Sequence, residues 1–181
     1  MKILIAVPCF DQVPTLFAQS LALLRKVDEC TLAMKSGSLV YTARNDLATY
    51  AISMDADYVF WLDSDMVFDQ DVLERMMKTL KDNDLDILTG LYFRRVPPYS
   101  PVLFDKLDIK DDICDWSEFK TIPEGLFEVG GCGFGCVLMK TDVFYGLGYN
   151  MADGLKLLVD TVAKDEGDDE FYLCVLSAVA S

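Results

Sequence analysis

The chain has 181 residues, 52% of them apolar, and a formal net charge of −14, which suits one domain with a hydrophobic core. The acidic balance leaves no basic surplus to neutralise phosphates, so we expect no nucleic-acid partner. The chain has no histidine, which removes every Ser-His-Asp or Cys-His mechanism, and the spacing of its six cysteines offers no tetrahedral zinc site. We expect reduced, buried cysteines, a cytoplasmic location and no transmembrane segment.

The first half of the chain alternates apolar runs with helical periodicity. Residues 2–8 form an apolar run typical of a buried parallel strand, and Pro8 ends it before a turn at residues 9–12. A helix is predicted over residues 15–26, and residues 36–38 form a turn. A second helix is predicted over residues 43–54, with an apolar face formed by Leu47, Tyr50, Ala51 and Met54.

A second apolar strand is predicted over residues 57–62, and Asp63-Ser64-Asp65 follows it directly. Asp69 is a plausible N-cap for a third helix that ends at Asp82. The apolar stripe of this helix is formed by Val72, Leu73, Met76, Met77 and Leu80. A third strand is predicted to begin within residues 85–90.

The second half of the chain is less regular. Residues 96–101 are predicted to form an extended loop, and the acidic, weakly patterned residues 105–118 a surface excursion. A short strand is predicted over residues 127–129, and another over residues 136–139 after the glycine-rich residues 130–135.

Strands that alternate with helices predict an α/β fold with a mostly parallel sheet flanked by helices and right-handed crossovers. In such sheets ligands bind outside the carboxyl ends of the strands. The pair Asp63 and Asp65 and the turn after Pro8 are both predicted at that edge, which is the first physical argument for function.

Two carboxylates spaced i, i+2 at a strand end can both face one side of a cleft. Carboxylate and diphosphate oxygens suit a hard divalent ion, Mn²⁺ or Mg²⁺, so Asp63 and Asp65 are predicted metal ligands. The same residues also fit the D-x-D-x-[TV] motif of haloacid dehalogenase-like phosphatases, with Asp63 as nucleophile and Asp65 as acid/base. That motif normally ends the first strand of its domain, whereas here a strand-helix-helix unit precedes it. A catalytically incomplete nucleotide-binding domain is the third alternative.

Six segments occur in a fixed order: residues 2–11, 42–45 (T-A-R-N), 57–68 (with D-S-D-M), 86–92, 129–144 and 167–171 (G-D-D-E-F). Together they resemble a family-two-like glycosyltransferase of the GT-A fold with a D-x-D motif, across nearly the whole chain. The chain departs from that pattern at Asp168, where the family has Glu, and in lacking a histidine ligand. The resemblance implies one GT-A domain over residues 1–181, with a nucleotide-sugar half at 1–95 and an acceptor half at 96–181. The chain stops inside the helix expected after Asp169, so either the protein is short or residues that complete the site are missing.

The resemblance also implies a hexosyltransferase that moves a sugar from a UDP- or GDP-sugar to a saccharide, lipid or protein acceptor, with inversion. Asp169 is the expected base, and the donor is expected to contact Pro8, Phe10, Asp11, Arg44, Asp63 and Ser64. Arg44 would donate to the diphosphate, and the alternative is a surface ion pair with Asp46 or Asp57. Trp116 and Tyr92 could stack on a sugar, although aromatic side chains more often belong to the core.

Overall fold

A computed structural model describes residues 1–37, 39–110 and 113–146 of the chain. These residues divide into two compact units. The first contains Met1–Gly90 and the segment that begins at Gly135, and the second contains Leu91–Phe134. Within the described ranges, no helix has both the length and the apolar character needed to cross a membrane.

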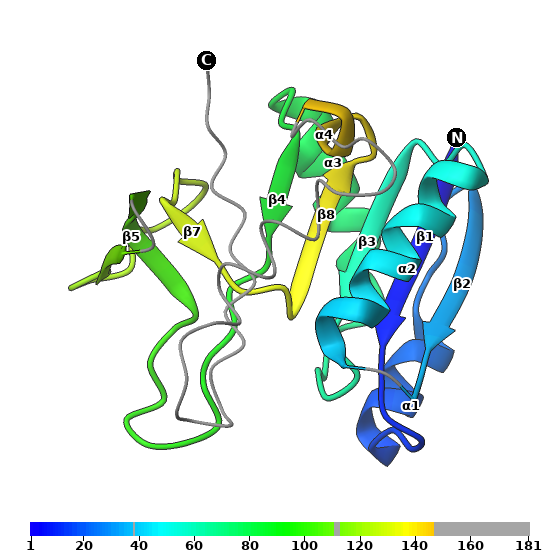
Figure 1. The fold of residues 1–181 in the computed structure, drawn as a ribbon, viewed down its shortest axis with the longest axis horizontal. Coiled ribbons are helices and arrows are strands. Elements are labelled where there is room, and N and C mark those ends of the chain that lie inside the picture. Colours follow the sequence, from blue (N-terminus) through cyan, green and yellow to red (C-terminus); the bar gives the residue numbers. More distant parts are fainter. Residues whose placement is uncertain (38, 111–112, 147–181) are drawn as a thin grey trace. The chain divides into compact units, whose positions relative to one another are not determined.

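The first unit is built on a five-stranded sheet (Figure 1). Its order is β2 (Glu29–Lys35), β1 (Lys2–Pro8), β3 (Tyr58–Leu62), β8 (Cys136–Lys140) and β4 (Ile87–Thr89). Strand β1 pairs in parallel with both β2 and β3, whereas β8 runs antiparallel to its neighbours β3 and β4. The predicted α/β fold with a mostly parallel sheet is therefore confirmed.

Helices cover both faces of this sheet. Helix α2 (Val40–Ser53) packs on β1, β2 and β3. Side chains of α1 (Thr15–Leu23) and α3 (Val72–Asp82) form a core with Ile3, Ile5 and Val7, the residues of β1 that face away from α2. The chain crosses from β1 to β2 in one direction and from β2 to β3 in the other, and two right-handed crossovers of opposite direction place their helices on opposite faces.

The clearest sequence patterns correspond to observed elements. Strand β1 has the predicted bounds, β3 differs by one residue, and four of the five predicted stripe residues of α3 are buried. Helix α2 begins three residues before the predicted start and ends before Met54, and Tyr50, predicted on its apolar face, is 46% exposed while Ala48 and Ala51 are fully buried. The buried face of this helix also contains Leu47 and Ile52. Asp71, not Asp69, precedes the first residue of α3, and its side chain makes no cap hydrogen bond.

Strand β2 is not among the predicted elements. It forms the edge of the sheet, and in the described structure only one of its sides is hydrogen-bonded to a neighbouring strand. Its apolar side chains Leu32 and Met34 stay more than two-fifths exposed. A half-exposed edge strand does not need a continuous apolar run, which explains the weak pattern.

The second unit contains a three-stranded sheet in the order β6 (Ile113–Glu118), β5 (Leu103–Lys110) and β7 (Gly131–Cys132). The prediction of a surface excursion at residues 105–118 was wrong, because β5 and β6 pair there as an antiparallel hairpin. The sequence gives no regular alternation of apolar and charged residues here, since Leu103 and Phe104 are adjacent in β5 and are followed by Asp105 and Lys106. The strand predicted over residues 127–129 is not formed. Phe127 instead packs edge to face on Phe119, with ring centroids 5.4 Å apart.

A short helix, α4 (Asp142–Gly146), follows β8 in the first unit. Phe144 of this helix is fully buried. The amide N–H of Thr141, just before the helix, donates to the Asp57 carbonyl at 3.0 Å. This contact joins the end of β8 to the start of β3, whose carboxyl end carries the aspartate pair.

Candidate functional site

The aspartate pair lies at the carboxyl edge of the parallel part of the sheet. Ala6 of β1 is paired with Trp61 of β3, so the two strands end at the same edge. Asp63 leaves β3 there, and its amide N–H donates to the Gly135 carbonyl at 3.0 Å. The turn after β1 and the D-x-D segment are thus neighbours, as the sequence predicted.

A buried ion pair joins the D-x-D segment to helix α2. Arg44 Nη2 donates to Asp63 Oδ1 at 2.7 Å. The Arg44 side chain is 6% exposed and that of Asp63 is 33% exposed. Helix α2 starts at the carboxyl edge of the sheet because it follows β2, and this brings its first turns beside the end of β3.

The alternative of a surface ion pair for Arg44 was wrong, because the side chain is buried. Asp46 pairs with Lys35 at 2.7 Å, and the Asp57 carboxylate accepts the Lys2 amide N–H at 2.7 Å. One signal in the sequence could have identified this arrangement. Arg44 lies three and seven residues before Leu47 and Ala51, on the face of the helix that is buried.

The ion pair changes the electrostatics of the D-x-D segment. The guanidinium offsets one of two nearby negative charges, so the carboxylates of Asp63 and Asp65 can lie close together at lower cost. A carboxylate has two oxygens and about four acceptor positions, and the Arg44 contact uses one oxygen. Asp63 therefore retains the capacity to accept a hydroxyl donor or to contact a cation. Asp65, two residues further on, is exposed to solvent.

The loop after Asp65 is anchored to α1. The Phe68 amide N–H donates to the Ser20 hydroxyl at 3.3 Å, and the Phe68 ring packs edge to face on Phe17 with centroids 6.1 Å apart. Ser20 and Phe17 are both buried. These contacts fix the loop that carries Asp65 against the hydrophobic core.

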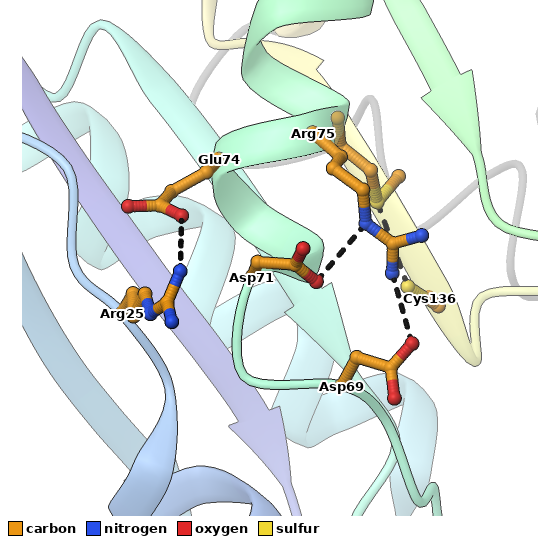
Figure 2. Close-up of polar contacts among 7 residues, drawn as sticks. Arg25, Asp69, Asp71, Glu74, Arg75 and Cys136 are labelled. Atoms are coloured by element: carbon orange, nitrogen blue, oxygen red, sulfur yellow. Dashed lines mark hydrogen bonds and ion pairs between the residues drawn. The ribbon is translucent and has the colours of Figure 1, made fainter.

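The same loop is held at the start of α3 by an arginine between two aspartates. Figure 2 shows Arg75 facing both carboxylates, with Nη2 3.2 Å from Asp69 and Nε 3.1 Å from Asp71. Arg25, on the segment after α1, reaches Glu74 at 3.5 Å. All of these side chains are substantially exposed, so each pair contributes little to stability. The two contacts of Arg75 link the residues just before α3 to its first turn.

Cys136 follows Gly135, whose carbonyl accepts the Asp63 amide, and its thiol remains neutral. It is buried, and its Sγ contacts Met76 Sδ at 3.7 Å. Burial, with a smaller contribution from the Asp63 carboxylate, raises the pKa of the Cys136 thiol to about 12. A thiol this hard to ionise is a structural hydrophobe rather than a nucleophile or ligand. Cys9, Cys30, Cys132 and Cys136 take part in no disulfide, and Cys9 and Cys30 are only partly buried, not buried as predicted.

The remaining predicted residues fall into three groups. Pro8 is buried at the end of β1, whereas Phe10, 80% exposed, and Asp11 present their side chains to solvent on the turn that follows. Ser64 is partly buried between the two aspartates. Asp169 lies outside the described residues. Within the described ranges, no cluster of three or more histidine, cysteine, aspartate or glutamate side chains could hold a metal ion by itself.

Comparisons with known proteins agree with this architecture. The solved structure "Crystal Structure of A197 from STIV" is similar to this chain with a TM-score of 0.54 and 19% sequence identity. The similarity covers 77% of this chain and 65% of that chain, so this chain spans less than two-thirds of A197 and shares its fold. No curated protein matches the sequence.

The sequence model of Glycosyl transferase family 2 matches residues 34–148. The matched segment contains α2 with Arg44, the strand β3 with its aspartate pair, and strand β8. Since it spans more than half of the 181 residues, the chain belongs to glycosyl transferase family 2.

Proposed function

We propose that this chain transfers a hexose from a nucleoside diphosphate sugar, with UDP or GDP as the nucleotide, to an acceptor hydroxyl. One observation carries the proposal: the buried Arg44–Asp63 ion pair beside Asp65, at the carboxyl edge of the sheet and inside the segment that matches the family. Ligands of open α/β sheets bind at this edge.

The donor nucleotide would bind across the ends of β1 and β3. The turn formed by Pro8, Phe10 and Asp11 would hold the base, where the exposed Phe10 ring can stack and the Asp11 carboxylate can accept a hydrogen bond. Asp63 and Ser64 would contact the ribose. Arg44 would support the diphosphate by its positive charge and by holding Asp63 in place.

The residues present fit a divalent ion held jointly with the substrate. Mg²⁺ and similar ions are often bound by one or two carboxylates together with substrate phosphate oxygens, so Asp63 and Asp65 suffice on the protein side. A site shared with the substrate needs no third protein ligand, and the described residues contain no cluster of three or more such side chains. When bound, Mn²⁺ or Mg²⁺ would neutralise the charge that develops on the departing diphosphate.

Asp169 is the proposed general base, on the strength of its sequence motif. Its carboxylate would take the proton of the acceptor hydroxyl while that oxygen forms a bond to the anomeric carbon of the donor. The bond between the anomeric carbon and the diphosphate oxygen breaks, and its electron pair leaves with the nucleoside diphosphate. Attack from the side opposite the leaving group inverts the anomeric configuration.

Thermal denaturation with UDP or GDP, with and without Mn²⁺, tests the proposal. A ligand that binds only the folded chain raises Tm, and saturation at 100 Kd stabilises it by about 2.7 kcal/mol. We expect a rise that requires both nucleotide and metal and that is lost in Asp65→Ala. The control Asp82→Ala removes an exposed carboxylate at the end of α3, paired with Lys78, and should keep the rise.

Three results would contradict the proposal. A full metal-dependent rise in Asp65→Ala would show that the aspartate pair is not the donor site. A rise with a phosphate mimic and Mg²⁺ but with neither nucleotide would favour the aspartate-nucleophile phosphatase. No rise under any condition would identify an incomplete domain without donor binding.

A further inference from the structure

The second unit presents a half-exposed indole in a fixed orientation. Trp116 on β6 is 48% exposed, whereas Trp61, the other tryptophan of the chain, is 1% exposed. The Trp116 ring packs edge to face on Phe104, with centroids 5.6 Å apart and an interplanar angle of 83°. Phe104 is itself buried. A buried ring therefore holds the indole while much of its surface faces solvent, so Trp116 does not belong to the core.

An ion pair lies on the same face of the sheet. Glu118 follows Trp116 by two residues, so both side chains leave β6 on one side. The register agrees, since Glu118 is paired with Phe104, the residue whose ring contacts the indole. Arg94 Nη2 donates to Glu118 Oε1 at 3.2 Å, and the two side chains are 27% and 35% exposed. This face thus offers a flat apolar ring beside a partly exposed carboxylate and guanidinium.

That combination matches a pyranose. A sugar ring has an apolar face of C–H groups, which the electron-rich face of an aromatic ring attracts, and a rim of hydroxyls. The hydroxyls can donate to the Glu118 carboxylate and accept from the Arg94 guanidinium. We propose that Trp116, Glu118 and Arg94 form a saccharide-binding surface of the second unit, and that the acceptor of the proposed transferase is a saccharide.

The ion pair distinguishes a saccharide from a lipid acceptor. A lipid chain laid on the indole would cover Arg94 and Glu118 without offering them hydrogen bonds, and desolvating charges without new partners is unfavourable. A sugar replaces the displaced water with its own hydroxyls. The assignment of the bound sugar as the acceptor rests on the proposed function, whereas the binding itself does not.

The presence of only two tryptophans makes the binding directly measurable. Titration of the full chain with maltotriose, cellotriose or triacetylchitotriose, without nucleotide or metal, should give a saturable change in tryptophan fluorescence for at least one sugar. The change should come from Trp116, because Trp61 is buried in β3. Saturation-transfer NMR then compares the variants.

We expect Trp116→Ala to weaken binding of that sugar by about tenfold or more, and Trp116→Tyr by less. Glu118→Gln tests the hydrogen-bonding role without removing the ring, and should also weaken binding. The matched control Tyr50→Ala removes an aromatic ring of similar exposure from α2 in the first unit, and should leave affinity unchanged.

The proposal is overturned if none of the three sugars gives a saturable response, or if Trp116→Ala and Glu118→Gln both bind as the wild type does. These measurements contain no nucleotide. Their failure therefore leaves the metal-dependent UDP or GDP result untouched, and the reverse also holds. Sugar binding without a nucleotide response would place the saccharide surface on a domain that does not use nucleotide donors.

Discussion

The Arg44–Asp63 ion pair should behave as a coupled unit in unfolding experiments. The perturbation is a double-mutant cycle with Arg44→Met and Asp63→Asn, substitutions that keep much of each side chain's volume while removing its charge. Arg44 is almost fully buried, and Asp63 is one-third exposed. Removal of Asp63 alone leaves a guanidinium in a buried position beside a neutral amide, so we expect this single change to cost more than Arg44→Met.

The size of the coupling follows from the geometry. The N–O distance of 2.7 Å places the charge centres about 4 Å apart, and at an effective dielectric constant of 20 their attraction is about 4 kcal/mol. Partial exposure of Asp63 and the lost hydration of both charges offset part of this attraction. We therefore expect a coupling free energy of about 2 kcal/mol.

Urea unfolding gives the free energy of unfolding of the wild type, both single variants and the double variant. The coupling free energy is the change in the double variant minus the sum of the changes in the two single variants. High salt should reduce this coupling less than that of a fully exposed pair, because the Arg44 side chain is only 6% exposed. A coupling below about 0.5 kcal/mol, typical of distant sites, would refute the reasoning that this pair fixes the D-x-D segment.

Three further predictions concern stability. Because burial raises the pKa of the Cys136 thiol from 9.0 to about 12, the free energy of unfolding should be at its full value below pH 9 and should fall as the pH rises towards 12. In urea titrations, Cys136→Ala should lose less unfolding free energy over this range, by up to about 1.4 kcal/mol per pH unit. An added Cβ at Gly133 would lie 2.1 Å from the Tyr92 hydroxyl oxygen, so Gly133→Ala should cost about 1–3 kcal/mol and Tyr92→Phe should restore part of it; an unchanged urea midpoint would contradict the packing. Leu73→Ala, at a fully buried position of α3, should cost about 2–5 kcal/mol, whereas Leu23→Ala at an exposed position of α1 should stay within about 0.5 kcal/mol, and equal effects would argue against the assigned core.

The sequence predicted those parts whose burial is strong and local. Buried strands must be apolar on both faces, so β1 and β3 stand out as continuous runs, and α3 shows a clean stripe because only one of its faces meets the core. The position of the D-x-D segment follows from β3 and was predicted correctly. The nucleotide, metal and base assignments for Asp11, Asp65 and Asp169 stay predictions.

Elements with partial exposure were not recognisable in the same way. Strand β2 and the hairpin of β5 and β6 each leave a face or an edge in water, so their side chains alternate too weakly to be distinguished from loops. Two aromatic residues are more exposed than their residue type indicates. Tyr50 was predicted on the apolar face of a helix but is exposed. Trp116 is an aromatic residue of the kind that usually belongs to a core, but it lies outside the core.

Sequence by itself determined the alternation of strands and helices, the apolar stripe of α3 and the placing of two aspartates at a strand end. Tertiary structure alone decided that β8 runs antiparallel between β3 and β4, and that Arg44 reaches Asp63 across 19 positions of the chain. The spacing of apolar residues indicates which side of a single helix or strand is buried and which side is exposed. Which elements then become neighbours depends on the crossovers between strands, and that long-range pairing decides which charges meet at the site.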